Sequence, residues 1–444
     1  MTKCTTTKAV FQAELFPSLK HRKIKVDFNG GNVSSDGGVL LLKQIDRKVN
    51  ILPRITSIME KYDSRQPGKI THSLHSMLVQ RIYGIACGYE DLNDHHTLRH
   101  DIAWQTAAGK VDKLASVPTL HRFEKQSIRQ MTKELMNLMI DIFIESFTCN
   151  PGEIILDFDN TNNTIHGNQE GRFFHGYYDE YCFLPLHVFC GEKMVTSLLQ
   201  PSWKDGAKHA GAILKIITDK LRQKWPDIKI IYRGDSGFCR QRHLNWCDKN
   251  NIKYIIGIAR NQRLEEMTSR LACKAEKQYN RTQEKAKLFC DIDYSAKSWK
   301  KTRRIIAKAE HTDKGKNQRY VVTNLDDPAQ YLYEEVYCGR GNMENRIKEQ
   351  KLDLFSDRTS AHEWWSNQFR MLLSAFAYIL FERMRNIALK GTELAKAQVD
   401  TIRLKLLKIG AVIKRNTRSI YFSLSSSCPF QNIFWKVAES FAPG

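Results

Sequence analysis

The chain has 444 residues, with 69 Lys and Arg against 48 Asp and Glu, a formal net charge of +21 and a hydrophobic content of 42%. This length is sufficient for two or three domains with real cores. A chain this basic is typical of proteins that meet a polyanion, because each phosphate neutralised by Lys or Arg releases condensed counterions. We find no span of about 18 apolar residues and no signal peptide. These features favour nucleic acid over a membrane surface, and we expect a cytoplasmic, nucleoid-associated protein.

The first region, residues 1–150, is predicted to be mainly helical. Near its start, a short strand and a glycine turn are expected before a helix that begins after Ser34, Ser35 and Asp36. From about residue 71 to residue 147, apolar residues recur at intervals of three and four, which is typical of amphipathic helices. A basic helical region is compatible with DNA binding and assembly, and equally with a plain helical bundle.

The composition changes at residue 151, where strands begin to alternate with helices. The expected strands are EIILDF, CFLPLHVFCG, KMVTSLLQ, DIKIIYRGDSGF (ending in its glycine-flanked aspartate) and KYIIGIA. The expected helices are GAILKIITDKLRQKW and HLNWCDKNN. This alternation predicts an α/β domain with a mixed sheet over residues 151–260.

The last third of the chain is predicted to contain three segments. Residues 261–335 lose the α/β alternation and read as several short strands rich in Lys and Arg, an inserted β subdomain. Residues 336–390 return to helix, and we expect Trp364 and Trp365 of this segment to lie in the core. Residues 391–444 are the C-terminal region.

Three acidic positions stand at places that suit a metal site. Asp157 and Asp159 share one face of the strand EIILDFDN, and two dehydrated carboxylates there would need a cation or solvent to offset their repulsion. Asp235 ends another apolar strand between two glycines, and strand ends are where α/β sheets place their chemistry. Either feature alone is equally compatible with an ordinary turn aspartate.

The third acidic position, Glu344, lies on a predicted helix. At about 100° per residue, Tyr337, Arg340, Lys348 and Lys351 fall with it in a sector of about 80°. A solvated charged face explains such a stripe by itself. Combined with the upstream aspartates, the same stripe suits a site where carboxylates hold Mg²⁺ and cations meet phosphates. Glu349 falls on another face and is expected to be an ordinary surface carboxylate.

The spacing of these residues resembles a known family. Tyr337, Arg340, Glu344 and Lys351 reproduce the Y-(2)-R-(3)-E-(6)-K signature of DDE transposases in the insertion-sequence 4 clan. The stretches DFDNT, RGDSGFCR, LASVPTLHRFEK and NRIKEQKLDLFSDRTSAHEWWSNQFR look like its insertion-sequence 1380 family. The resemblance extends over most of the chain.

The resemblance implies a fold and a set of metal ligands. The expected fold is α/β, with a ribonuclease-H-like catalytic domain split by a β-rich insertion, a mainly helical N-terminal region and a helical C-terminal part. Asp159, Asp235 and Glu344 match the three catalytic, metal-binding acidic positions. In the D-x-T element the middle residue here is Asn160, and Asp157 remains the alternative to Asp159.

The resemblance also implies DNA contacts on two elements. Tyr337, Arg340, Lys348 and Lys351 would handle phosphates at the cleaved end. In relatives, an aromatic side chain of the β insertion holds a flipped base, and Trp299 is the candidate, although an ordinary strand tryptophan explains it too. The basic residues around it are further predicted DNA contacts: Lys300, Lys301, Arg303 and Arg304.

The implied activity is that of a cut-and-paste DNA transposase. Such an enzyme binds the terminal inverted repeats of an insertion sequence, cleaves them with Mg²⁺ (or Mn²⁺ as a substitute) and joins the 3′-OH ends to target DNA. Its expected partners are double-stranded DNA and a second copy of the chain, with no membrane. The alternative is a transposase-derived DNA-binding protein or repressor that has lost cleavage. A general ribonuclease-H-like nuclease is a third reading.

Overall fold

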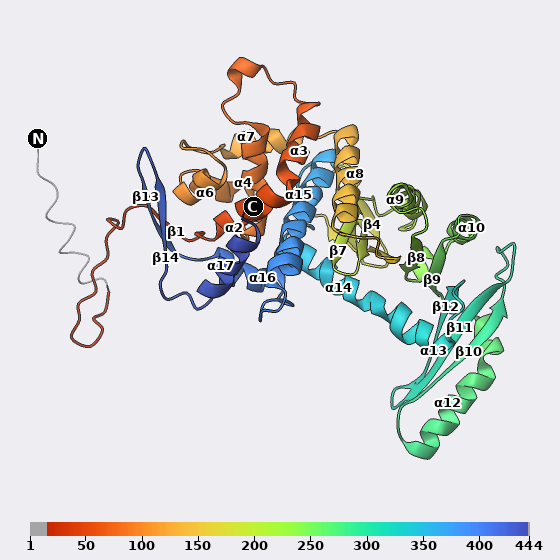
Figure 1. Cartoon of the computed structure of the whole chain (residues 1–444). Coiled ribbons are helices and arrows are strands. Elements are labelled where there is room, and N and C mark those ends of the chain that lie inside the picture. Colours follow the sequence, from red (N-terminus) through yellow and green to blue (C-terminus); the bar gives the residue numbers. More distant parts are fainter. Residues whose placement is uncertain (1–15, 443–444) are drawn as a thin grey trace, which may run out of the picture.

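The computed structural model describes residues 16–442, and the fold is a helical body joined to a long mixed sheet (Figure 1). The N-terminal part confirms the predicted helical character. Its elements are β1 (Val33–Ser34), α2 (Val39–Val49), α3 (Ile51–Glu60), α4 (Leu74–Ala86), α5 (His95–Leu98), α6 (Ile102–Ala107), α7 (Val117–Lys125) and α8 (Arg129–Glu145), with short 3₁₀ turns at Pro67–Lys69 and Leu92–Asp94.

The central part alternates strands and helices, as predicted for residues 151–260. It contains β2 (Glu153–Asn160), β3 (Asn163–Thr164), β4 (Phe173–His175), β5 (Glu180–Phe183), β6 (Leu186–Cys190), β7 (Lys193–Leu198), α9 (Ala210–Lys224), β8 (Lys229–Gly234), η3 (Ser236–Phe238), α10 (Gln241–Lys249) and β9 (Lys253–Ile258). β3, β5 and β4 form a small sheet of their own.

The insertion differs from the predicted set of short strands. It begins with two helices, α11 (Gln262–Met267) and α12 (Ser269–Thr282). Three long strands follow: β10 (Ala286–Tyr294), β11 (Arg303–Thr312) and β12 (Gly315–Thr323). Because β12 pairs with β9, these strands extend the central sheet and do not form a separate β subdomain.

The main sheet has eight strands in the order β10-β11-β12-β9-β8-β2-β6-β7. β2, β8 and β9 run parallel at its centre, while β6 and β12 add antiparallel strands on the two sides. Apolar residues of β2 and β8 pack on one face with α9 and α10 in a single core. The carboxyl ends of β2 and β8 therefore meet at one edge of the sheet.

A nearly continuous helical rod connects the insertion with the helical body (Figure 1). It comprises α13 (Ala329–Tyr331), the π-helical η4 (Leu332–Tyr337), the 3₁₀ turn η5 (Cys338–Arg340), α14 (Gly341–Lys348) and the π-helical η6 (Glu349–Asp353). Glu344 is helical as predicted. The changes of helix type around Tyr337 and Lys351 mean that an ideal 100° step does not describe the ends of the predicted stripe.

The remaining elements complete the helical body. They are α15 (Trp364–Arg383), η7 (Met384–Leu389), α16 (Val399–Ile402), η8 (Arg403–Leu407), β13 (Ala411–Arg415), β14 (Ile420–Leu424) and α17 (Gln431–Ser440). α15 packs against α4, α8 and β7, and is largely buried. The prediction that Trp364 and Trp365 lie in the core is wrong. Both lie in the first turn of α15 and are only partly buried.

The C-terminal region packs on the N-terminal region and shares its core. β13 pairs with β1, and Lys408 forms an ion pair with the buried Asp36 at 2.8 Å. Between residues 16 and 442, no helix combines the length and apolar character needed to cross a bilayer.

The expectation that Glu349 is an ordinary surface carboxylate is also wrong. Glu349 is 2% exposed and forms ion pairs with Arg385 and, at 2.9 Å, with Arg346. Burial raises the pKa of Glu349, and the charge of Arg385 partly offsets this effect. The pair fixes the helical rod to η7 and so holds α14 against the helical body.

We predict that Glu349→Gln destabilises the protein by about 3–5 kcal/mol, because it leaves the buried Arg385 guanidinium without its charged partner. The measurement is equilibrium unfolding by denaturant. Glu335→Gln is the matched control, since Glu335 lies exposed on the same rod and its substitution should change stability by less than about 0.5 kcal/mol. Equal stability of the two variants would contradict a structural role for Glu349.

Candidate active site

The two aspartates of β2 lie in different environments, although strand alternation puts them on the same face. Asp157 is 1% exposed, and its two carboxylate oxygens accept hydrogen bonds from Nε and Nη2 of Arg233, the latter at 2.7 Å. The parallel register places Asp157 beside Arg233, so that the two side chains meet on one face. Burial raises the pKa of Asp157, and Arg233 partly offsets that rise. Asp157 is thus fully engaged in an ion pair.

Arg233 also reaches the helical rod. Its Nη1 donates a hydrogen bond to the carbonyl oxygen of Val336, one residue before Tyr337. The sequence analysis did not single out Arg233. The sequence does contain a signal for it: Arg233 is a charged residue in the mostly apolar stretch IIYRG, which indicates a buried side chain with an ionic partner.

Asp159 faces the helical rod directly. Its Oδ2 accepts a hydrogen bond from Nη1 of Arg340 at 2.8 Å, and Oδ1 accepts one from the backbone N–H of Asn160 at 3.0 Å. Burial raises the pKa of Asp159 to about 6 and the negative charge of Asp235 adds to the rise, against the opposing effect of Arg340. A carboxyl group in this position gains from a nearby positive charge.

Asp235 lies next to Asp159 at the edge of the sheet. It follows β8 directly. Phe158 of β2 and Gly234 of β8 are the last residues paired in the parallel register, and Asp159 and Asp235 are the residues that come next. The Asp235 side chain caps η3 by accepting a hydrogen bond from the N–H of Gly237 at 2.9 Å. The strand ends of the parallel pair therefore bring two carboxylates together.

Glu344 joins this group through Arg340. It lies in the first turn of α14 and is the more exposed member of the group, with a side chain 54% accessible. Nη2 of Arg340 donates to Oε1 of Glu344 at 2.9 Å, while Nη1 of the same guanidinium donates to Asp159. Arg340 thus connects the end of β2 to α14, with one carboxylate on each side.

The carboxylates of Asp159, Asp235 and Glu344 are the type of ligand that binds a hard divalent ion. Carboxylate oxygens are the ligands that Mg²⁺ prefers, and Asp159 and Asp235 are close enough for each charge to affect the other. The arrangement is not a closed set of three: among residues 16–442, no group of three or more His, Cys, Asp or Glu side chains is gathered closely enough to hold a metal ion. The guanidinium of Arg340 supplies the positive charge between Asp159 and Glu344 instead.

Tyr337 lies beside Asp235. Its ring packs against Tyr333 at a centroid distance of 5.5 Å, and burial raises the pKa of Tyr337. A Cβ atom on Gly257 would come within 2.6 Å of the Tyr337 hydroxyl oxygen and 2.9 Å of the backbone N of Ser236. Gly257 therefore leaves the space that lets the phenol approach the loop that carries Asp235.

The two lysines of the signature helix differ in their contacts. Lys351 reaches back to the loop after β2, where Nζ donates to the carbonyl oxygen of Asn162 at 2.6 Å and to the hydroxyl of Thr161 at 3.3 Å. Lys348 is exposed and forms no ion pair with any residue of the described chain. Both cations lie on the helical rod that carries Glu344, and their contact with phosphates stays a prediction.

Trp299 and Arg303 of the insertion form a packed cluster. The Trp299 ring is partly buried, 5.8 Å from the ring of Tyr294, and the Arg303 guanidinium lies 5.8 Å from its centroid. Arg303 is 5% exposed and donates to Asp248 at 2.6 Å and to Asn245 at 2.7 Å. We therefore withdraw the prediction that Arg303 contacts DNA, because its side chain is buried and both terminal nitrogens donate hydrogen bonds inside the protein.

The other three cations of this cluster differ in availability. Lys301 pairs with Asp248 at 2.6 Å, and Arg304 pairs with Asp291 at 2.7 Å. Lys300 is exposed and has no ion-pair partner within residues 16–442. Of the predicted insertion contacts, Lys300 is the most available to a phosphate.

Comparisons with known proteins identify the family. The model of the family described as "Transposase DDE domain group 1" matches residues 16–443. No curated protein sequence matches the chain significantly. Among solved structures, the chain is similar to a cryo-EM structure of the piggyBac transposase synaptic complex with hairpin DNA. That match has a TM-score of 0.39 and 10% identity over 83% of this chain and 80% of that one, and a likeness this distant carries no argument about residues. The family match spans nearly the whole chain, so the protein belongs to the group 1 family of DDE transposase domains.

Proposed function

We propose that this DDE transposase cleaves DNA and transfers strands at the edge of the sheet where β2 and β8 end, using Asp159, Asp235 and Glu344. The observation that carries the proposal is the fork of Arg340, whose two terminal nitrogens contact Asp159 and Glu344. These carboxylates are 185 positions apart in sequence, and their contact with the same guanidinium supports a shared site. Asp157 is less suitable as a ligand because both of its oxygens are bound to Arg233.

The proposed cofactor is Mg²⁺, with Mn²⁺ as a substitute. Asp159, Asp235 and Glu344 would hold it, and a bound divalent ion supplies activation of an attacking oxygen and stabilisation of a leaving one. The chain contributes the oxygen ligands and a set of phosphate donors. Arg340 can offer both terminal nitrogens to a phosphate, because a guanidinium binds phosphate oxygens in a bidentate manner. Tyr337, Lys348 and Lys351 line the same helical rod beside it.

The proposed reaction has two kinds of step at phosphorus. In cleavage, a water oxygen bonds to phosphorus as the bond from phosphorus to the 3′ oxygen breaks, which leaves a 3′-OH on the element. In joining, that 3′ oxygen bonds to a target phosphorus and the bond to the displaced oxygen breaks. No oxidant or reductant is needed. Both steps require negatively charged DNA to be held close to a group of carboxylates, which explains why cations surround them.

The proposed fold and domain arrangement follow from the sheet. Three parallel strands bordered by the antiparallel β6 and β7 support a ribonuclease-H-like core, with the segment 261–335 inserted between Asp235 and Glu344. We propose residues 1–150 as the DNA-binding and assembly region, 151–260 and 336–390 as the two parts of the catalytic core, and 391–444 as the C-terminal region.

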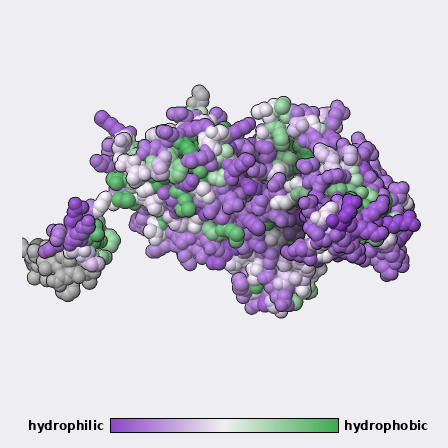
Figure 2. All heavy atoms as spheres, turned by 90° about the horizontal axis from the view of Figure 1, so that it is seen from below, coloured by the Kyte–Doolittle hydropathy of each residue, from purple (hydrophilic) through white to green (hydrophobic). Residues whose placement is uncertain are grey.

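The proposed partners are double-stranded DNA, as terminal inverted repeats and as target, and a second copy of the chain that would bring two ends together. The net charge of +21 supports a polyanionic partner. Figure 2 shows a face on which hydrophilic residues predominate and apolar ones are scattered. Insertion sequences of the insertion-sequence 4 clan, 1380 family, are the proposed elements.

A second candidate function is a DNA-binding protein that no longer cleaves. The position of Arg340 between Asp159 and Glu344 favours it, because an internal cation there neutralises the carboxylates without a metal. Under the first candidate function, the contact of Arg340 with the carboxylates belongs to the DNA-free protein, and a DNA phosphate would replace the carboxylates as its partner. Cleavage by the wild-type protein distinguishes the two.

We predict that Glu344→Gln lowers cleavage of DNA carrying the element's own ends in Mg²⁺ by about a hundredfold or more, because a metal ligand contributes several kcal/mol to the transition state. The measurement is the rate of strand nicking on labelled DNA. Glu335→Gln, an exposed carboxylate on the same rod, is the control and should cleave like wild type. Equal cleavage by Glu344→Gln and wild type would remove Glu344 from the site, and binding without nicking by wild type would support the second candidate.

We predict opposite effects for the two aspartates of β2. Asp157→Asn should lower the free energy of unfolding by about 3–5 kcal/mol, because it leaves Arg233 buried without a charged partner. Asp159→Asn should change stability by about 1 kcal/mol or less, because its partner Arg340 keeps Glu344, yet abolish cleavage. Denaturant unfolding and nicking assays on both variants check this. Full activity in Asp159→Asn would favour Asp157 as the ligand.

We predict that DNA binding weakens steeply with salt. With six or more phosphate contacts, affinity should fall by about 10³-fold or more between about 50 and 200 mM salt. Lys348→Gln should reduce the slope of log K against log salt by about one, whereas Lys215→Gln, an exposed lysine of α9, should leave it unchanged. Fluorescence anisotropy with a labelled duplex measures both, and a flat salt response would argue against a phosphate-dominated interface.

A further inference from the structure

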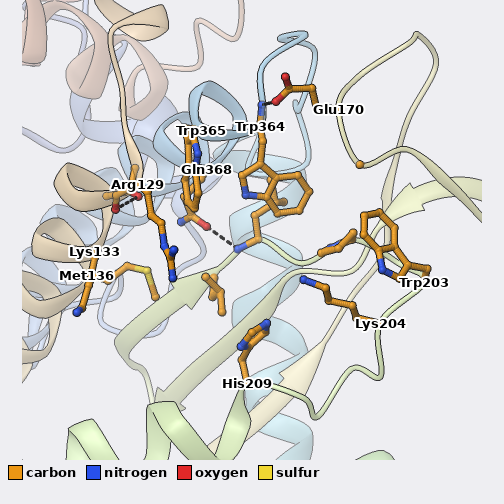
Figure 3. A pocket seen from close by; sticks show the side chains of 15 residues that line it. Arg129, Lys133, Met136, Glu170, Trp203, Lys204, His209, Trp364, Trp365 and Gln368 are labelled. Atoms are coloured by element: carbon orange, nitrogen blue, oxygen red, sulfur yellow. Dashed lines mark hydrogen bonds between the residues drawn. The ribbon is translucent and has the colours of Figure 1, made fainter.

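A cavity of about 620 Å³ opens between α8, the start of α15 and the loop that follows β7 (Figure 3). Three tryptophans line it: Trp203, Trp364 and Trp365. Three cations line it as well: Arg129, Lys133 and Lys204. We call it the indole cavity. None of these six residues has a role in the site described above.

The indole rings are held from behind and remain open to the cavity. Trp364 packs edge-on against Phe183 at a centroid distance of 5.1 Å, and Gly171 lies so close that a Cβ there would be 2.8 Å from the ring. Trp203 packs edge-on against Phe173 at 6.2 Å and is 52% exposed. Aromatic faces that are fixed in place and open to solvent are suited to stacking a planar ring.

The cations of the indole cavity are free to meet an anion. Arg129 and Lys133 lie exposed at the start of α8, and neither forms an ion pair with any residue in the described part of the chain. Nζ of Lys204 lies 5.8 Å from the Trp203 ring centroid. The carboxylate at the rim, Glu170, accepts a hydrogen bond from the backbone N–H of Trp364 at 2.9 Å. The charge around the cavity is therefore positive overall.

One loop connects the indole cavity with the candidate active site. Trp203 and Lys204 lie on the cavity side of this loop, and Gly206 lies on its other side against Asn160. A Cβ on Gly206 would be 2.8 Å from Oδ1 of Asn160, which directly follows Asp159. The loop that lines the cavity thus also contacts the end of β2 that carries Asp159.

We propose that the indole cavity binds an unpaired nucleotide of the DNA next to the cleaved bond, with its base stacked on the indoles and its phosphates on Arg129, Lys133 and Lys204. The combination of a stacking surface with unpaired cations is the chemistry that recognises single-stranded nucleic acid. A neutral aromatic ligand would not need the cations, and a cationic ligand would be repelled by them. The inference rests on the proposed function, since it assumes that DNA lies at Asp159.

Trp299 is a weaker candidate than Trp203 for stacking a base. Its ring is already packed against Tyr294 and lies under the Arg303 guanidinium. Trp203 has a free face and a neighbouring lysine. The indole cavity therefore takes the base-stacking role that the sequence analysis assigned to Trp299.

The test compares binding of two labelled DNAs, a blunt duplex and the same duplex with a short thymine overhang, in fluorescence anisotropy. Trp203→Ala should weaken binding of the overhang DNA by between about fivefold and a hundredfold and leave the blunt duplex within about twofold. Trp203→Phe should retain most of the preference. Trp435→Ala, which removes an exposed tryptophan of α17, and Trp299→Ala should behave like wild type. Equal losses on both DNAs, or none, would overturn the proposal.

A second measurement uses the wild-type protein, so that folding of variants does not matter. The overhang is made with 5-bromodeoxyuridine, crosslinked by light and mapped by mass spectrometry. Crosslinks should map to residues 199–209 or 361–370, and crosslinks only around Trp299 would overturn the proposal. Its failure is distinguishable from that of the proposed function. A wild-type protein that cleaves DNA but shows no preference for the overhang rejects the cavity alone, while a wild-type protein that prefers the overhang but does not cleave rejects the catalytic role alone.

Discussion

The buried ion pair between Asp157 and Arg233 is the contact on which the geometry of the site depends. Each of its members would be costly without the other, because an uncompensated charge in a protein interior is strongly unfavourable. Arg233 uses its remaining donor on the carbonyl oxygen of Val336. Through this one side chain, β2, β8 and the helical rod are held together next to the strand ends. The position of Arg340, four residues after Val336, follows from that contact.

The second constraint is the repulsion between the carboxylates that this packing gathers. Burial and the neighbouring Asp235 both make the ionised form of Asp159 less favourable, and Arg340 compensates. A guanidinium is suited to this task because its planar fork can serve two partners at once. The same fork is suited to phosphate, so under the proposed function a DNA phosphate and the carboxylates would compete for Arg340. Exchange of Arg340 from carboxylate to phosphate would leave the acidic groups with oxygens free for a cation.

Much of the site could be predicted from the sequence because its parts are local signals. Strand alternation put Asp157 and Asp159 on one face of β2, a glycine-flanked strand end marked Asp235, and helical spacing grouped Glu344 with three cations. The choice of Asp159 over Asp157 came from the family resemblance. What could not be predicted depends on partners brought in by the fold. Asp157 and Asp159 are indistinguishable by alternation, and only the register with β8 gives Asp157 its Arg233.

The same reason explains the errors on the C-terminal side. Glu349 looks like a surface residue on a helix of mixed charge, but its partner Arg385 lies 36 positions further along the chain, in η7, which continues α15. Trp364 and Trp365 are large and apolar like core residues, yet both are only partly buried and line a cavity together with the loop after β7. In the insertion, α12 has a polar sequence whose few apolar residues gather on one face against β10 and β11.

The most direct measurement of the central claim, that one metal site is built from β2, β8 and α14, is affinity cleavage of the polypeptide. Fe²⁺ binds oxygen and nitrogen sites more tightly than Mn²⁺, and with ascorbate and peroxide it cuts the nearby backbone. The expected result is a set of cuts close to Asp159, Asp235 and Glu344 in the same sample, which are suppressed by excess Mg²⁺. Cuts at only one of these three segments, or cuts that Mg²⁺ does not suppress, would contradict a shared site.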